Sequence, residues 1–262
     1  MNFGLKDKVA VIGGSSKGLG KGCAISLAKE GVHIVLCANG EQSLAETAHL
    51  IETLGVKVLP LEVDMSSKDD NEKIIKETID TFGKIDILVN NSGGPLPGTF
   101  FDFSDKDWEK AFNDVLMYVV RLTRGVIPYM KKNKWGRIIN ITSLVVKEPA
   151  ETLVLSNVFR TGVVSLAKTL SKELIKNNIT INNICPGAFK TDRAIELMKV
   201  AAKEKGVTIE DIEKEAIKTM PLGRYQKPEE LGALVAFLCS ELASGITGTT
   251  IQIDGGISKG LF

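Results

Sequence analysis

The sequence predicts a single α/β domain in which helices cover both faces of a doubly wound parallel sheet. Short runs rich in valine and isoleucine, typical of strands buried on both faces, alternate along the chain with longer stretches of helical apolar spacing. Two of these runs stop abruptly in clusters of glycine and small polar residues. Because the chain contains no internal repeat and no low-complexity linker, we expect one domain over residues 1–262.

The first apolar run, residues 9–12, leads into a glycine-rich loop over residues 13–20. A helix that begins at Gly18 would direct its free N–H groups and the positive end of its dipole into this loop. That arrangement is typical of a βαβ unit that binds a pyrophosphate, although an ordinary turn with positive φ angles also explains a glycine cluster. The sequence therefore predicts a phosphate-binding loop, with the plain turn as the alternative.

The second apolar run begins at residue 33 and ends near Ala38, where the adenosine ribose of a dinucleotide would lie. An acidic residue at this point selects a free 2′-hydroxyl group, whereas a basic residue selects a 2′-phosphate. Asn39 and Gly40 follow Ala38 and provide no acid, and Lys17 in the first loop could reach a phosphate. The sequence thus favours NADP(H) over NAD(H), while a Lys17 side chain that is merely solvated is an equally good alternative.

The remainder of the chain continues the alternation of strands and helices. Asp64 ends a third strand, and the polar cluster 90–94 follows a fourth, so both lie where open sheets bind ligands. We expect helices at residues 21–29, 44–54, 70–82, 107–130 and 156–176, a last helix entered through residues 221–231, and further strands at residues 56–64, 85–89, 136–144, 180–187 and 249–256.

Four motifs, in their order along the chain, resemble those of the short-chain dehydrogenase/reductase family: residues 14–20, residues 90–93, Pro186-Gly187 and residues 254–256. The resemblance covers essentially the full length. It is closest to the reductases of 3-oxoacyl thioesters and to sugar dehydrogenases, with Gly13 where that family usually has threonine. It implies a single-domain Rossmann fold, a nicotinamide cofactor, a small carbonyl or alcohol substrate, and commonly a homotetramer.

The motifs and the strand ends together indicate which residues contact the cofactor. Thr191 matches the family position that contacts the amide and phosphates of the cofactor. The predicted cofactor-binding residues are Gly14, Ser16, Lys17, Gly18, Leu19, Gly20, Asn39, Asp64, Asn90, Ser92, Gly93, Arg160, Pro186, Gly187 and Thr191.

The catalytic positions of the family are altered in this chain. Ser143 matches the family's catalytic serine, although a serine at a strand end is often only a cap. Counting from Ser143, the family's tyrosine and lysine fall on Ser156 and Arg160, and counting from Trp108, its helix asparagine falls on Val115. A serine hydroxyl is a far weaker acid than a phenol, and arginine stays protonated in proteins. We expect Ser143, Ser156 and Arg160 to form an atypical catalytic site, with Tyr118 as a packing residue.

Three functions compete for this site. The favoured one is an NAD(P)(H)-dependent oxidoreductase acting on a carbonyl or hydroxyl substrate, whose proton comes from Ser143, from water or from an acidic substrate group. The second is a non-catalytic nucleotide-binding homologue. The third is a lyase that needs only a clamp for an oxyanion.

A charged helical stretch broken by Gly206 lies near the end of the chain. Because it is longer than a plain connection needs, we expect a mobile lid over residues 190–222. The alternative is a solvated helical pair that packs against a neighbouring subunit.

Composition excludes several classes of partner. With 25% charged residues and a net charge of +1, the chain offers no electrostatic attraction for nucleic acid or an anionic membrane. Four scattered cysteines and two histidines predict neither a disulfide framework nor a metal site. No apolar run is long enough to span a membrane and no secretory leader is evident, so we expect a cytoplasmic protein.

Overall fold

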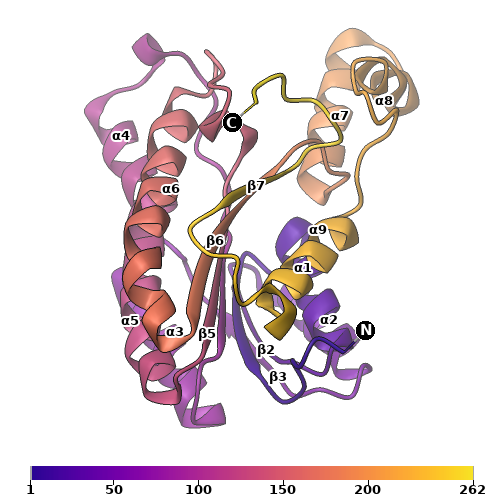
Figure 1. The fold of residues 1–262 in the computed structure, drawn as a ribbon. Helices are drawn as coiled ribbons and strands as arrows, with labels where there is room; N and C mark the ends of the chain where they lie inside the picture. The colour runs from indigo at the N-terminus through magenta and orange to yellow at the C-terminus, as the bar shows by residue number, and fades with distance from the viewer. Residues whose placement is uncertain (1, 262) are drawn as a thin grey trace.

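All strands of the protein pair in parallel in one sheet, as the alternation of runs predicts. The computed structural model describes residues 2–261 and gives a 7-stranded sheet of order β3-β2-β1-β4-β5-β6-β7 (Figure 1). The order reverses between β1 and β4, so the crevice that binds ligands in such sheets opens at the carboxyl ends of these two strands. The strands are β1 Val9–Gly13, β2 His33–Ala38, β3 Val58–Glu62, β4 Ile87–Asn90, β5 Gly136–Ile141, β6 Ile179–Pro186 and β7 Thr250–Ile253.

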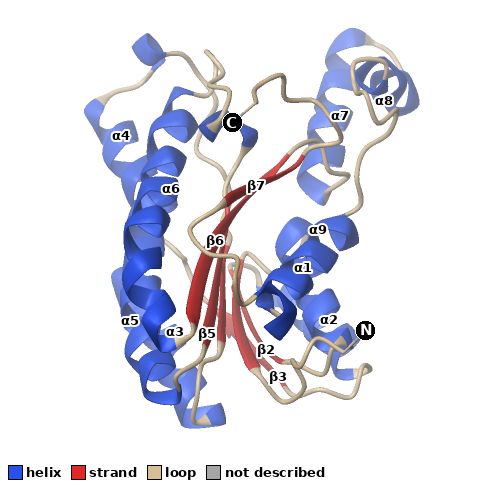
Figure 2. Cartoon of the chain, viewed as in Figure 1, coloured by secondary structure: helices blue, strands red, loops and turns tan. Residues whose placement is uncertain are grey.

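Helices form a layer on each face of the sheet. One layer contains α1, α2 and α9, and the other contains α3, α5 and α6 (Figure 2). The α-helices are α1 Gly18–Lys29, α2 Glu41–Glu52, α3 Lys68–Phe82, α4 Asp105–Ala111, α5 Tyr118–Asn133, α6 Val154–Leu174, α7 Asp192–Lys205, α8 Ile209–Ile217 and α9 Pro228–Cys239. Shorter turns are η1 Phe100–Asp102, η2 Phe112–Met117, η3 Leu144–Val146, η4 Ile175–Asn177 and η5 Glu241–Ala243.

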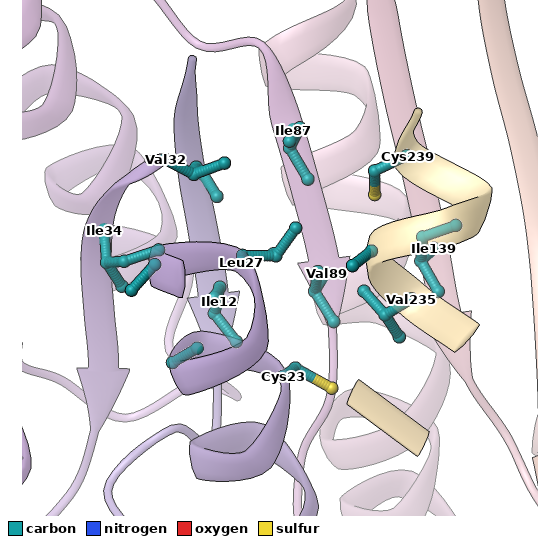
Figure 3. Close-up of a cluster of buried hydrophobic side chains, with 14 of the residues drawn as sticks. Ile12, Cys23, Leu27, Val32, Ile34, Ile87, Val89, Ile139, Val235 and Cys239 are labelled. Carbon is teal, nitrogen blue, oxygen red and sulfur yellow. The ribbon is translucent and has the colours of Figure 1, made fainter. Parts of the chain in front are cut away.

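A hydrophobic core lies on each face of the sheet, and successive residues of a strand point alternately into one core and the other. Ile12 and Ile34 belong to the same core as Leu27 of α1 and Val235 of α9 (Figure 3). Val11, the neighbour of Ile12, belongs instead to the core beneath α3, α5 and α6. Burying one such leucine or isoleucine contributes about 1.5–3 kcal/mol, so both faces of the sheet hold their helices firmly.

Three elements depart from the general pattern of buried strands and unbroken helices. The strands β3 and β7 are only partly buried, because they form the two edges of the sheet. The single helix expected over residues 107–130 is interrupted by the wide turn η2, which has π-helical geometry. A π turn widens the hydrogen-bonding ladder of a helix. In η2 the carbonyl of Asp114 accepts a hydrogen bond from the hydroxyl of Ser92 at 3.1 Å, so the turn reaches the loop that follows β4.

The charged stretch after β6 folds into α7 and α8, as its pattern predicts. Gly206 ends α7 in the left-handed conformation with a φ of 67°, which favours glycine. Figure 1 shows both helices gathered at one end of the molecule, beyond α9. Within residues 2–261, no helix combines the length and the apolar character needed to cross a bilayer.

Candidate active site

Two hollows lie together at the carboxyl ends of the strands. We call them the large cleft, of about 610 Å³, and the small hollow, of about 280 Å³. They share Gly14 and residues 92–94, so they are two parts of one crevice. The large cleft is lined by Gly14, Lys17, Gly18, Leu19, Asn91, Ser92, Gly93, Gly94, Pro95, Thr142, Ser143, Leu153, Ser156, Arg160, Pro186, Gly187, Thr191, Asp192, Arg193 and Glu196. The small hollow is lined by Gly14, Ala38, Asn39, Val63, Asp64, Met65, Ser66, Ser92, Gly93, Gly94, Lys110 and Asp114.

The glycine-rich loop is held in a tight conformation between β1 and α1. Gly14 has a φ of 54°, and a Cβ atom on Gly20 would overlap the carbonyl oxygen of Gly14. The amide of Cys37 donates a hydrogen bond to the hydroxyl of Ser15 at 2.9 Å, which ties the loop to β2. These positions need glycine for backbone geometry and close approach, which are the properties of a loop that lets a ligand reach the main chain.

The start of α1 is the part of this loop that attracts anions. Lys17 is the N-terminal cap, and its side chain makes no capping hydrogen bond. The amide of Gly18 donates a hydrogen bond to the carboxylate of Asp192 at 3.2 Å. A Cβ atom on Gly18 would lie 3.4 Å from the side chain of Thr191, so the start of α7 packs directly against the start of α1. A negatively charged group therefore already occupies part of this helix N-terminus, as the dipole favours.

In the second polar cluster, the two neighbouring asparagines have different roles. Asn90 is 1% exposed, and its amide donates to the side-chain oxygen of Asn140 at 2.8 Å, so it lies beneath the crevice and does not line it. Asn91 lines the large cleft, and its amide donates to the carbonyls of Gly13 and Gly14 at 3.0 and 3.3 Å. Asn91 thus joins the two loops. The sequence prediction did not include Asn91 among the site residues, although the pair of neighbouring asparagines pointed to it.

Ser143 stands just after β5, at the wall of the large cleft. Its hydroxyl accepts a hydrogen bond from the amide of Val145 at 3.3 Å and caps the turn η3. A hydroxyl that accepts from the backbone still has its own proton to donate. Both expectations for Ser143, the cap and the donor facing a ligand, are compatible with this geometry.

Arg160 reaches the cleft from α6, one helical turn after Ser156. Its Nη1 donates hydrogen bonds to the carbonyls of Ile141 and Thr142, both at 3.0 Å, which fixes the guanidinium at the end of β5. Burial lowers the pKa of Arg160, while the nearby Tyr118 raises it. Ser156 is 7% exposed and lines the same cleft. The helix therefore presents a hydroxyl and a cation to one space, as the spacing on a helix face predicts.

Tyr118 and Val115 lie behind Arg160 on η2 and α5. Tyr118 is 2% exposed and belongs to the core beneath α5 and α6, which confirms the expected packing role. Burial raises the pKa of Tyr118, and a hydrogen bond with Ser92 lowers it. Val115 is 3% exposed and lines a narrow interior gap together with Tyr118 and Arg160. Because residue 115 is a valine, its side chain offers Arg160 no hydrogen-bonding group from this side.

The small hollow contains the residues expected at the adenosine end of a dinucleotide. Asn39 and Asp64 both line it, and the ion pair between Lys110 and Asp114 at 2.7 Å stands on another wall. One carboxylate oxygen of Asp64 accepts hydrogen bonds from the amide and hydroxyl of Ser66. Lys17 is exposed and lines the large cleft, whereas Asn39 lines the small hollow.

Most of the predicted site residues meet in this crevice. Ser16 and Gly20 line neither part of it, because the carbonyl of Ser16 accepts from Thr47 at 2.8 Å and Gly20 is buried in α1. Sequence reasoning missed the residues that α7 contributes, Asp192, Arg193 and Glu196, since no motif marks them. Among residues 2–261, no group of histidine, cysteine, aspartate and glutamate could hold a metal ion.

A parallel sheet with a glycine loop at its switch point and a cleft at the carboxyl ends of its strands defines a nucleotide-binding α/β protein of the Rossmann type. A family profile described as "Enoyl-(Acyl carrier protein) reductase" matches residues 14–258. The chain belongs to the short-chain dehydrogenase/reductase family.

Relatives in this family match over nearly the whole chain. The 3-oxoacyl-[acyl-carrier-protein] reductase FabG of Aquifex aeolicus is 33% identical over 98% of this chain and 100% of its own length. Among solved structures, the L-sorbose reductase of Gluconobacter frateurii, complexed with NADPH and L-sorbose, is 36% identical over 100% of both chains, with a TM-score of 0.96. The actinorhodin polyketide ketoreductase with NADPH is 29% identical over 97% of this chain and 98% of its own, with a TM-score of 0.90.

Proposed function

We propose that the protein is an NAD(P)(H)-dependent oxidoreductase that acts on a carbonyl or hydroxyl substrate through an atypical active site. The observation that carries the proposal is the meeting of the phosphate loop with Ser143, Ser156 and Arg160 in one cleft. The relatives named above are reductases, and two of the solved ones hold NADPH. The protein offers the same kind of crevice to a dinucleotide.

The residues present fit a nicotinamide dinucleotide. The N-terminus of α1 already binds a carboxylate, as an anion site should. In the loop before it, glycine stands where a Cβ atom would collide with neighbouring atoms. Gly14, Gly18, Leu19 and Thr191 would hold the pyrophosphate end, while Asn39 and Asp64 would hold the adenosine end. We propose NADP(H) as the preferred form, because the end of β2 carries no acid and Lys17 is an available cation.

The bound nicotinamide would supply or accept a hydride at the substrate's carbonyl carbon. Ser143 would donate a hydrogen bond to the carbonyl oxygen from the wall of the cleft. The positive charge of Arg160, fixed by its bonds to two carbonyls, would stabilise the alkoxide that develops there. Ser156 stands where the family has its acidic tyrosine, so the proton must reach the alkoxide from Ser143, from water or from the substrate itself.

Three further features belong to the proposal: a lid, a homotetramer and a cytoplasmic location. We assign residues 190–222 to a lid, supported by the contribution of α7 to the cleft and by the ion pair between Lys190 and Glu213 at 2.7 Å, which ties α8 to the start of this segment. We assign a homotetramer, supported by an apolar groove on the outer face of α5 and α6. A cytoplasmic location agrees with the four cysteines being free thiols.

A non-catalytic homologue is the second candidate, and the replacement of the tyrosine by Ser156 favours it. Calorimetry with NADPH and NADH, followed by measurement of NADPH consumption with a panel of ketones, aldehydes and 3-oxoacyl thioesters, separates the two. We expect binding and turnover, and a loss of turnover of roughly 10²-fold in Ser143→Ala. The control Ser165→Ala changes an exposed serine of α6 outside the cleft and should leave turnover intact. Binding without consumption of NADPH would establish the non-catalytic function, and elimination from a hydroxy substrate without cofactor turnover would establish a lyase.

A further inference from the structure

Two arginines line the large cleft, and no acid forms an ion pair with either of them among residues 2–261. Arg160 comes from α6 and Arg193 comes from α7, and both line this cleft. Elsewhere in residues 2–261, Arg137 and Arg224 form ion pairs with Glu241 and Glu230. Neither Arg160 nor Arg193 has such a partner among the described residues. Arg160 is half-buried, whereas Arg193 is exposed. A half-buried cation that has no anionic partner is an arrangement that an anionic ligand completes.

The guanidinium of Arg160 has donors left for a ligand. Its Nη1 is used by the carbonyls of Ile141 and Thr142, while its Nε and Nη2 make no hydrogen bond within the described part of the chain. A Cβ atom on Gly94 would lie 3.8 Å from Nη2, so this edge of the guanidinium faces the loop that lines the cleft. An arginine edge with free donors matches the two oxygens of a carboxylate or phosphate.

The charge of Arg193 acts on the same space. It lowers the pKa of Arg160, in addition to the larger effect of burial, so the two positive groups repel each other across the cleft. The acids that also line the cleft do not lie between them in bonding contact. Asp192 is bound to the amide of Gly18, and Glu196 is exposed and makes no ion pair among residues 2–261. An anion bound between the two arginines would remove their repulsion.

We propose that the substrate is an anionic carbonyl compound whose carboxylate or phosphate group is held by Arg193 together with the free edge of Arg160. This inference rests on the proposed oxidoreductase function for the identity of the reacting group. It assigns Arg193, a residue of the lid, to substrate specificity. The carbonyl would lie toward Ser143 and Ser156, and the charged end toward α7.

The test uses three pairs of probes, each with one anionic and one neutral member on the same carbonyl skeleton: acetoacetate and methyl acetoacetate, 2-oxobutyrate and methyl 2-oxobutyrate, and dihydroxyacetone phosphate and dihydroxyacetone. Their binding to the NADPH-saturated protein is measured by calorimetry, so the result does not depend on turnover. If NADPH does not bind, the oxidoreductase proposal fails, and the same titrations on the free protein still test the anion site. We expect the charged member of at least one pair to bind about tenfold or more tightly than its neutral partner.

Variants show which residue causes the preference for the charged probe. Arg193→Gln should bring the charged and neutral probes to nearly equal affinity, Arg193→Lys should retain part of the preference, and NADPH affinity should stay unchanged in both. Lys199→Gln removes an exposed cation of α7 that does not line the cleft and should leave the preference intact. Equal affinities in all three pairs for the unmodified protein would overturn the proposal. A loss of NADPH affinity in Arg193→Gln, with anion preference intact, would assign Arg193 to the cofactor instead.

Discussion

The carboxylate of Asp192 accepts a hydrogen bond from the amide of Gly18, a residue 174 positions earlier in the chain. This contact joins the first residue of α7 to the first residue of α1, the helix that follows the glycine loop. A cofactor phosphate, where one binds as we propose, and the Asp192 carboxylate would both be attracted to the same helix N-terminus. On that proposal, the position of α7 and the binding of a phosphate would depend on each other.

Replacing Asp192 by asparagine should tighten NADPH binding. The amide side chain can still accept the bond from Gly18, but it lacks the charge that repels a pyrophosphate. A charge at a helix end is worth about 0.3–1 kcal/mol, so we expect the dissociation constant to fall about two- to fivefold at low salt, and less at high salt. Calorimetry at two ionic strengths measures this. Glu196→Gln, a change to another exposed acid of the cleft, is the control and should have a smaller effect. Weaker binding in Asp192→Asn would mean that the carboxylate supports the occupied loop.

Replacing Lys17 by glutamate should weaken NADPH binding much more than NADH binding. Lys17 is exposed and its side chain makes no capping bond, so it is free to contact a 2′-phosphate. We expect a loss of about tenfold or more for NADPH and a much smaller loss for NADH. Lys21→Glu is the control, because Lys21 lies near the start of the same helix but outside both parts of the crevice. Equal losses for the two cofactors would refute the assignment of Lys17 to the 2′-phosphate.

Restoring the family's catalytic residues should raise the reduction of simple ketones. The triple variant Ser156→Tyr, Arg160→Lys and Val115→Asn places an acidic phenol in the large cleft and a polar side chain behind it. General acid catalysis is worth roughly 10²–10⁴-fold, and residues that act as a unit are strongly non-additive. We therefore expect a rise in NADPH consumption of roughly 10²-fold for the triple variant and little change for each single one. Circular dichroism and thermal unfolding check that each variant is folded. An unmodified protein that already reduces a substrate rapidly, and loses this in Arg160→Lys but not in Ser156→Ala, would have a mechanism of its own.

A charge in the groove on α5 and α6 should break the proposed tetramer. The groove is lined by apolar side chains, including Ile127 on α5 and Leu166 and Leu170 on α6. Light scattering should give four times the chain mass of 28.3 kDa for the unmodified protein and a smaller species for Leu170→Glu, because the carboxylate would have to be desolvated. Thr169→Glu, at an exposed neighbour outside the groove, should leave the assembly unchanged. A monomer mass for the unmodified protein at micromolar concentration would contradict the assignment.

The fold could be predicted because its signals are local. Buried parallel strands such as β1 and β4 need continuous apolar runs, and the helices between them need one apolar face. The residues of each element therefore indicate which of its faces are buried. The glycine-rich loop could be predicted for the same reason, because the positive φ at Gly14 favours glycine and a Cβ atom on Gly20 would overlap the carbonyl oxygen of Gly14. The ends of the helices and strands differ from the predicted ends by a few residues. The π turn η2 could not be predicted, because no periodic pattern in the sequence marks it.

The sequence alone predicted the alternation of elements and a glycine-rich loop between the first strand and helix, and the family resemblance aligns Ser156 with the tyrosine position of the family. Only the tertiary structure decided which of Asn90 and Asn91 lines that cleft, and which residues α7 brings to it. The physical reason is distance along the chain: Asp192 contacts Gly18 of α1, and Arg193 lines the same cleft as Arg160 of α6, although these segments are remote in sequence. Such proximity imposes no spacing on the residues involved. Periodicity encodes which face of an element is buried. Which charges meet across a cleft follows only from how the elements pack.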